Sequence, residues 1–349
     1  MHLLRCVLLL KCTGSLLVVG LRIGQFSECR VQTRVLIATF FACCNWPYVH
    51  RIYFDLLRSR NGFLPRHLVS WFTKVLYQVM VPLLLHFVVR STPRVAALLN
   101  QLAELRRKLQ SPENSDRNFI FAASVYFAVL VWTETYTYWG EFSLIISYTA
   151  VSFFVSSFFF QICFFVTLFA DLYKEINEKL CAERINIKTL RHLNVYLENL
   201  HELWEEFHRL FGFLALILIL DYALYFMTVA CGITERLITC YFLKACSSEQ
   251  TSYIYNNLCW TYLNLFIILY IVKLSSDLEI EVNKIGPLLS KIANSLPHES
   301  NIRKLIRLST TLHWFEKFGF AVKIKKSGSV LVLAPQVSLI LSKNTANEA

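Results

Sequence analysis

The sequence predicts an all-α, multi-pass transmembrane helix bundle, and three observations support this prediction. Apolar residues make up 55% of the 349 residues, charged residues make up only 17%, and the apolar residues gather in long runs. A soluble domain usually carries about 25% charged residues. A chain of this composition cannot cover its apolar surface with a polar shell, so we expect a lipid bilayer to surround much of it.

Six apolar runs have the length of a spanning helix, which needs about 20 mainly apolar residues. They are residues 35–54, 68–89, 119–139, 144–169, 210–231 and 253–272. The first run is the weakest, because Asn45, Pro47, His50 and Arg51 interrupt its second half. We therefore predict a six-span bundle over residues 35–272.

Both ends of the chain fall outside these six spans. Residues 3–21 are apolar but contain Arg5 and Lys11, a pattern atypical of a signal peptide, so we expect an interfacial helix within a cytoplasmic N-terminal part, 1–34. A cytoplasmic helical segment, 273–327, follows the sixth span. In the last part, 328–349, the apolar residues 328–341 contain Pro335. A straight helix of that length rises about 21 Å, short of the roughly 30 Å hydrocarbon core, so we expect no regular seventh span.

The distribution of Lys and Arg predicts the orientation of the bundle. With the N-terminus in the cytoplasm, 27 of the 35 basic residues fall in the inner segments and six in the outer loops. Cytoplasmic loops of membrane proteins carry such an excess of Lys and Arg. The net charge of +11 is therefore interpreted as the result of membrane topology and not as a nucleic-acid surface.

Amphipathic patterns continue the spans beyond the membrane. Narrow apolar stripes favour packing of helix on helix in the cytoplasm, and amphipathic helices lying on the lipid surface are the alternative. The stripes with helical spacing are Val95, Leu98, Leu99, Leu102 and Leu109; Leu190, Leu193, Leu197, Leu200, Trp204, Phe207 and Phe211; and Leu278, Val282, Ile285, Leu289, Ile292 and Leu296.

No sequence motif indicates an enzyme. The chain contains no HExxH, no GxSxG, no P-loop and no CxxC pair. His201 and His208 lie two turns apart on one helix face, which is too few ligands for a zinc site. We therefore expect no catalytic residues, no bound metal and no cofactor. Cys240 and Cys246 in an outer loop are candidates for a disulfide.

An acidic residue lies within each of two predicted spans, where a charge costs at least a few kcal/mol and so marks a candidate functional site. Asp221 lies near the middle of the fifth span, close to Tyr222 and Tyr225. A ligand or ion contact would account for Asp221, and so would a structural hydrogen bond to a neighbouring helix. We include these three residues in the predicted ligand site.

Glu134 lies near the outer end of the third span, among Trp132, Tyr136 and Trp139. Aromatic rings around an acid can hold a cationic or amphipathic ligand by cation–π contact. An aromatic belt at the membrane surface is the alternative. These four residues complete the predicted ligand site.

The layout resembles that of the insect gustatory receptor family, which belongs to the insect chemosensory receptors. The resemblance rests on the inferred cytoplasmic N-terminus, long basic connections after spans two, four and six, and short outer loops. Leu10-Lys11-Cys12 followed by Gly20, and residues 312–320, are also similar to segments of that family.

The resemblance implies a seven-span, tastant-gated cation channel of the plasma membrane, in contact with membrane lipid and without a nucleic-acid partner. Four identical or related subunits would share one pore, and each would bind a small-molecule tastant in the outer half of its bundle. The family's seventh-span signature, Thr-Tyr, five apolar residues and Gln-Phe, is absent, since Gln336 is followed by Val337. That span lines the pore in the family, so we predict an impaired pore. A G-protein-coupled receptor and a small-molecule transporter remain alternatives.

Overall fold

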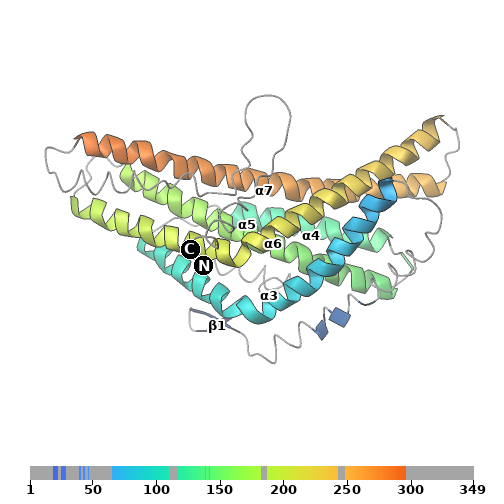
Figure 1. Ribbon diagram of the computed structural model, residues 1–349, viewed down its shortest axis with the longest axis horizontal. Coiled ribbons are helices and arrows are strands. Elements are labelled where there is room, and N and C mark those ends of the chain that lie inside the picture. Colours follow the sequence, from blue (N-terminus) through green and yellow to red (C-terminus); the bar gives the residue numbers. More distant parts are fainter. Residues whose placement is uncertain are drawn as a thin grey trace, which may run out of the picture.

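Five helices and one two-stranded hairpin form the described part of the computed structural model, which covers residues 19–22, 25–28, 39–40, 42–43, 46, 65–109, 116–137, 139–140, 142–181, 187–242 and 248–295. The helices run alternately in opposite directions along the longest axis of the molecule (Figure 1). The elements are β1 (Val19–Arg22), β2 (Gln25–Glu28), α3 (Pro65–Leu109), α4 (Asp116–Thr137), α5 (Phe142–Leu180), α6 (Ile187–Phe242) and α7 (Ser248–Ser295).

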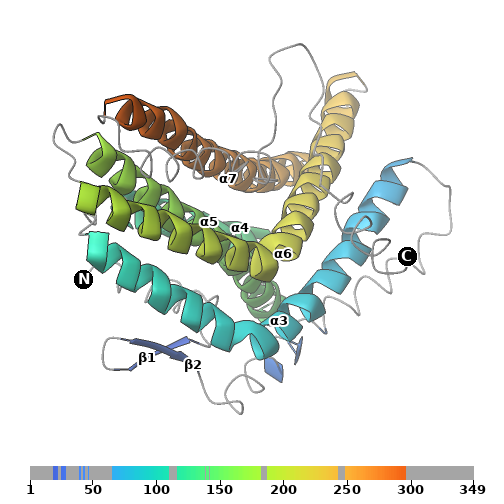
Figure 2. The same cartoon turned by 60° about the vertical axis from the view of Figure 1, so that its left-hand side comes forward.

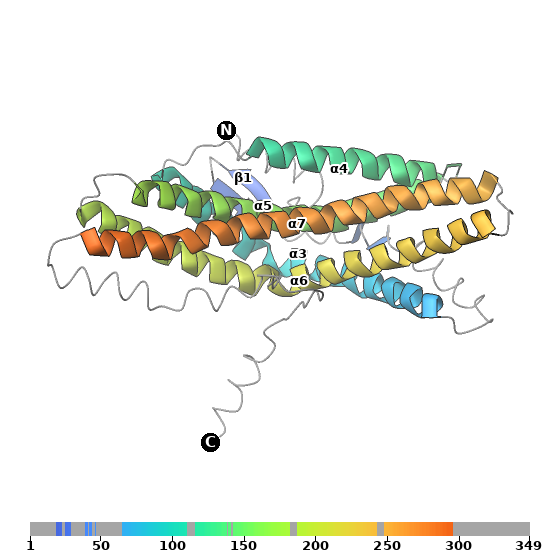
Figure 3. The same ribbon diagram turned by 90° about the horizontal axis from the view of Figure 1, so that it is seen from above.

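The helices differ in length, and the longest exceed the thickness of a bilayer. α6 has 56 residues and α7 has 48, which correspond to about 84 Å and 72 Å of straight helix. The hydrocarbon core of a membrane is only about 30 Å thick. Figure 3 shows that α4 covers about one half of the bundle while α7 runs along its full length. Much of α6 and α7 must therefore lie outside the hydrocarbon core.

Four of the predicted spans fall within helices that are long and apolar enough to cross a membrane. These candidate spans are Phe119–Thr137, Tyr148–Leu180, Thr189–Ile238 and Ile254–Leu289, in α4, α5, α6 and α7. They contain or overlap predicted spans three to six. The structure thus supports a multi-pass helical bundle, although six clear spans are not shown, because most of the first predicted span lies outside the described residues.

The second predicted span lies in a bent helix. In α3 the segments Val79–Val88 and Arg90–Leu109 meet at 60°. Pro93 has no backbone N–H, so the carbonyl of Val89 cannot receive its usual helical hydrogen bond at the bend. The bent pair counts as a fifth span only if both halves are taken together.

α5 is the central helix of the bundle and packs against α3, α4, α6 and α7. Its core-facing side chains are fully buried, and they include Phe154, Phe158, Phe160, Phe164, Phe165 and Phe169. In contrast, α6 and α7 expose large apolar side chains such as Phe213, Leu258, Tyr262 and Leu269. A lipid environment accounts for such exposed apolar surface, as the sequence predicted.

The apolar stripes of the inner helical extensions are buried between helices. All seven stripe residues of α6, from Leu190 to Phe211, are buried. The ring centroids of Phe169 and Trp204 lie 4.9 Å apart, and those of Phe165 and Phe207 lie 5.6 Å apart. The prediction of helix-on-helix packing is therefore confirmed for α6. The stripe residues Val95, Leu98, Leu99, Leu102 and Leu109 of α3 are buried too, as are Leu278, Val282 and Leu289 of α7.

Exposed ion pairs lie on the surface of the same helical extensions. Lys108 and Glu104 on α3 approach within 2.7 Å, and both side chains are about half exposed. The hydrogen bond and positive charge of Lys108 lower the pKa of Glu104 below its ordinary value. On α6, Arg209 lies 3.3 Å from Glu205. Such charged surfaces belong in water, which agrees with helices that continue beyond the membrane.

The N-terminal hairpin corrects the prediction of a purely helical fold. β1 pairs with β2 in antiparallel register, with Val19 opposite Glu28 and Arg22 opposite Gln25, and β2 packs against α3 (Figure 2). The predicted interfacial helix therefore does not reach Leu21. Val19 and Gly20 both favour helix less than most residues do, and Val19 suits a strand.

Other sequence predictions lie outside the described residues. These are the interfacial helix over 1–18, the short apolar segment 328–341 and Cys246. Cys240 is disulfide-bonded, but the predicted pairing with Cys246 stays a prediction.

Candidate functional site

A layer of polar side chains joins α4, α5 and α6 inside the apolar bundle. Ser156 of α5 lies 3.1 Å from the hydroxyl of Tyr126 on α4 and 3.1 Å from the hydroxyl of Tyr222 on α6. One helical turn away, the hydroxyl of Ser152 donates a 2.7 Å hydrogen bond to Oε1 of Glu134. These five residues are called the polar layer below. Apart from half-buried Ser152, all of them are buried.

Glu134 is the acidic member of the polar layer. Its side chain is only 1% exposed, because α4 turns this position toward α5 while its neighbours Trp132 and Tyr136 face outward. No hydrogen-bond partner of its Oε2 atom is found among the described residues. A buried acceptor without a partner costs about 1–3 kcal/mol. An incoming hydrogen-bond donor or cation could recover this cost at Oε2.

Tyr126 and Tyr222 enclose the polar layer with aromatic rings. Tyr126 stacks with Phe266 of α7 at 6.1 Å, and Tyr222 meets Phe159 of α5 edge-on at 5.7 Å. Each tyrosine thus presents a hydroxyl to Ser156 and a ring to its apolar neighbours. In an apolar environment such paired hydroxyls fix how three helices are rotated relative to one another.

Asp221 is a second buried acid. It is 5% exposed, and within the described part of the chain its Oδ1 atom has no hydrogen-bond partner. Asp221 precedes Tyr222 on α6, so its side chain leaves the helix on a different face. Among the described residues, no hydrogen bond joins Asp221 to the polar layer. Of the two explanations offered by the sequence, a structural hydrogen bond from another helix to Oδ1 is not observed among the described residues.

The predicted aromatic residues divide into two groups. Trp132, Tyr136 and Trp139 are 65%, 41% and 82% exposed. Tyr136 contacts Tyr255 of α7 at 5.7 Å. These three side chains lie on the outside of the bundle, which agrees with an aromatic belt, and Trp132 and Trp139 do not enclose the buried Glu134.

Tyr225 lies on the inner side of the bundle instead. It is half-buried and meets Trp260 of α7 edge-on at 5.8 Å. The structure therefore places Glu134, Asp221, Tyr222 and Tyr225 within the helix bundle. Among the predicted ligand residues, Glu134 bonds to Ser152 and Tyr222 lies within hydrogen-bond distance of Ser156, and the two serines are one turn apart on α5.

Sequence reasoning missed three members of the polar layer, namely Tyr126, Ser152 and Ser156. A signal for the serines was present, because Ser152 and Ser156 are spaced by one turn within an apolar run. Hydroxyl groups on one face of a spanning helix usually contact a neighbouring helix. Tyr126 had no comparable signal, since its partner is 30 residues away in the sequence.

The structure offers no competing metal centre in the part of the chain that it describes. No group of three or more His, Cys, Asp or Glu side chains gathers there. His201 pairs with Glu205 at 3.4 Å, one turn further along α6. This pairing agrees with a helix-surface role for His201.

Comparison with known proteins identifies the family. The family described as 7tm Chemosensory receptor matches residues 21–318, which include all five helices and both acids of the candidate site. No curated protein matches the chain. The match confirms the resemblance drawn from the layout. Members of this family are chemoreceptors for small molecules, and the family is not an enzyme family. The chain belongs to the 7tm chemosensory receptor family.

Proposed function

We propose that this chemoreceptor is a gustatory-type subunit of a tastant-gated cation channel in the plasma membrane. Its N-terminus lies in the cytoplasm, and it assembles with three identical or related subunits. The ligand site is proposed from the buried carboxyl of Glu134. Its Oε2 lacks a hydrogen-bond partner among the described residues, while its Oε1 accepts a hydrogen bond from Ser152. The orientation is supported by the excess of basic residues in the inner segments.

A ligand at Glu134 would act on three helices at once. It would contact Glu134 on α4 directly and would disturb the hydroxyl of Ser152 on α5. Ser152 is one helical turn from Ser156, whose hydroxyl lies 3.1 Å from that of Tyr222 on α6. α6 also contains Trp204 and Phe207, whose rings contact Phe169 of α5. A small rotation of α6 in the membrane would therefore reach the inner packing, because a continuous helix transmits rotation along its length.

Tyr225 and Asp221 would complete the proposed ligand site on α6. Trp132, Tyr136 and Trp139 would act at the membrane surface, where aromatic rings can concentrate an amphipathic ligand before it enters. A ligand that carries a positive charge and an apolar body fits this combination of buried acids and aromatic rings.

Whole-cell and excised-patch recording tests the proposed channel. We expect a panel of bitter, sweet and amine tastants to evoke cation current when the chain is co-expressed with a related receptor that retains the Thr-Tyr and Gln-Phe signature. The chain alone should give no current, because its own signature is absent. Responses should persist in excised patches without nucleotide, which a G-protein-coupled receptor would not allow. Ligand uptake without current would instead identify a transporter and contradict the proposal.

A further inference from the structure

Two exposed arginines lie where α3 leaves the predicted hydrocarbon core of the membrane. Arg90 directly follows the second predicted span, residues 68–89, and Arg94 lies one helical turn further along. Both side chains are exposed. They belong to one helical segment, Arg90–Leu109, and side chains four residues apart on a helix are neighbours, with Cβ atoms about 6 Å apart. The two guanidinium groups can therefore reach the same small anion.

An aromatic contact indicates the level of Arg90 relative to the membrane. Phe87 lies just before Arg90 on α3, and its ring centroid is 5.2 Å from that of Phe211 on α6. Phe211 lies at the inner end of the fifth predicted span, residues 210–231. The inner ends of the second and fifth predicted spans are therefore side by side. Lipid phosphates lie just outside the hydrocarbon core, so we place Arg90 at the level of the phosphates.

No acid neutralises the two arginines within the part of the chain that the structure describes. Neither Arg90 nor Arg94 forms an ion pair or a hydrogen bond there. The only acidic residue in the sequence of α3 is Glu104. It lies well beyond Arg94 and pairs with Lys108 at 2.7 Å. Two positive charges at the edge of the membrane are thus left without a partner of opposite sign.

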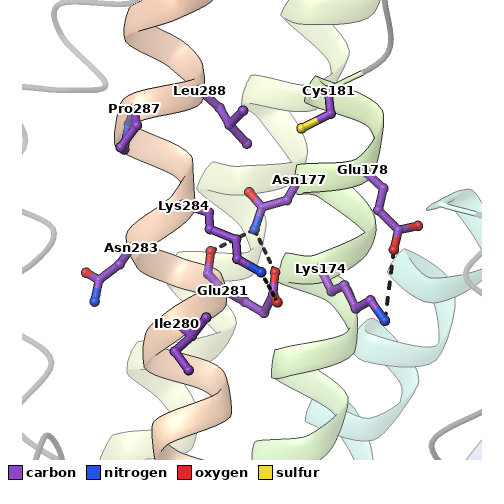
Figure 4. Close-up of a pocket in the computed structure, with 10 residues that line it drawn as sticks. All are labelled: Lys174, Asn177, Glu178, Cys181, Ile280, Glu281, Asn283, Lys284, Pro287 and Leu288. Atoms are coloured by element: carbon purple, nitrogen blue, oxygen red, sulfur yellow. Dashed lines mark hydrogen bonds and ion pairs between the residues drawn. The ribbon is translucent and has the colours of Figure 1, made fainter.

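Other basic side chains of the inner bundle differ in this respect. Around a cavity of about 620 Å³ between α5 and α7, Lys174 lies 4.0 Å from Glu178, and Lys284 lies 2.6 Å from Glu281 (Figure 4). Arg209 of α6 likewise approaches two glutamates, at 3.3 and 3.4 Å. These bases already have acidic partners, so they are poorer candidates for an external anion than the two arginines of α3.

The arginines of α3 lie on the side of the helix that faces away from the bundle. The opposite side of this segment is the buried apolar stripe that contains Val95, Leu98, Leu99 and Leu102. Arg94, Ala97 and Gln101 are exposed at spacings of three and four residues, which is one helix face. A lipid headgroup can therefore approach the arginines from the membrane without any change in helix packing.

We propose that Arg90 and Arg94 bind the phosphate of an anionic phospholipid. A guanidinium group is a planar fork of N–H donors that matches two phosphate oxygens, and two such groups balance a doubly charged phosphate. The acyl chains extend along the outer part of α3, where Val79 is 56% exposed. The leaflet alone rests on the proposed function: with a cytoplasmic N-terminus this lipid belongs to the inner leaflet, where anionic lipids are concentrated.

Native mass spectrometry of the purified full-length chain in detergent tests this site without depending on channel activity. The probe is dioleoyl phosphatidic acid, and dioleoyl phosphatidylcholine, which has the same acyl chains but no net charge, is the matched analogue. We expect phosphatidic acid to bind about tenfold more tightly, since charge-assisted hydrogen bonds are the stronger ones. An excess of inorganic phosphate should not displace it, because free phosphate lacks the acyl chains.

A double variant locates the binding. Arg90→Gln combined with Arg94→Gln should weaken the binding of phosphatidic acid about tenfold. Both positions are exposed, so we expect the variant to fold as the natural chain does. The matched control is Arg107→Gln combined with Arg191→Gln. It removes the same charge at two exposed positions of α3 and α6 outside the site, and it should bind the lipid as the natural chain does.

Equal affinity for the two lipids would overturn the proposal. So would equal weakening in the control double variant, which would indicate a general effect of net charge. Displacement of phosphatidic acid by inorganic phosphate would identify free phosphate as the ligand and reject the lipid. A receptor that gives no tastant current but still binds phosphatidic acid with the expected variant pattern would reject the proposed function and leave this site standing.

Discussion

Ser152 of α5 donates a 2.7 Å hydrogen bond to one carboxyl oxygen of Glu134 on α4, while the other oxygen has no partner among the described residues. This half-satisfied carboxyl lies in a bundle whose neighbouring side chains are mostly apolar. Protein interiors rarely leave such groups unpaired, and this exception is the reason for the ligand site that we propose. The Ser152–Glu134 pair is therefore the most informative contact of the proposed ligand site.

Glu134→Gln should weaken the response to cationic tastants without loss of surface expression. Glutamine has the same shape, and its oxygen can still accept the hydrogen bond from Ser152. An NH2 donor replaces the acceptor Oε2, so both the negative charge and the unpaired acceptor are removed. We expect the half-maximal ligand concentration to rise about tenfold. Concentration–response curves, combined with surface biotinylation, measure both quantities. Phe121→Leu, at an exposed position of the same helix, is the control and should leave the curve unchanged. An unchanged curve for Glu134→Gln would remove this residue from the ligand site.

Asp221→Asn tests the second buried acid separately. If Asp221 contacts the ligand or a permeating ion, the variant should shift the concentration–response curve by about tenfold while the receptor still reaches the surface. Leu220→Val is a suitable control, since Leu220 is adjacent on α6 but 42% exposed. If both acidic variants respond as the natural receptor does, the acids serve packing alone.

Trp204→Ala should destabilise the inner part of the bundle. Trp204 is 4% exposed and packs edge-on against Phe169 at 4.9 Å. Removal of a buried aromatic side chain costs about 3–5 kcal/mol. Thermal unfolding of the purified receptor in detergent should show a clearly lowered transition. The matched control is Val195→Ala on the same helix, where the side chain is 45% exposed and the cost should stay below about 1 kcal/mol. Similar transitions for both variants would contradict the role of the α6 stripe in stability.

The orientation of the bundle can be tested with an epitope at the N-terminus. The excess of Lys and Arg in the inner segments predicts that the epitope stains only after cells are permeabilised. An epitope inserted between α6 and α7, in residues 243–247, should stain intact cells and serves as the positive control. N-terminal staining of intact cells would reverse the orientation of the bundle.

The sequence by itself determined the helical class, the places of α4 to α7 and the buried stripe of α6. Hydropathy and helical periodicity are local properties, so runs such as 144–169 and the spacing from Leu190 to Phe211 can be read without tertiary information. The two buried acids were likewise visible as charges within apolar runs. Pro93 was also visible, and its effect on α3 could have been predicted from its missing N–H.

Only the tertiary structure decided which side chains meet. It turned Glu134 toward Ser152 while Trp132 stayed outside, and it joined Tyr126 to Tyr222 through Ser156. It also brought Asn177 beside Glu281, which lies 104 residues further along the chain. Such contacts depend on the rotation and register of each helix against its neighbours. Those are set by the packing of many side chains along the whole interface, so no local segment of sequence contains them.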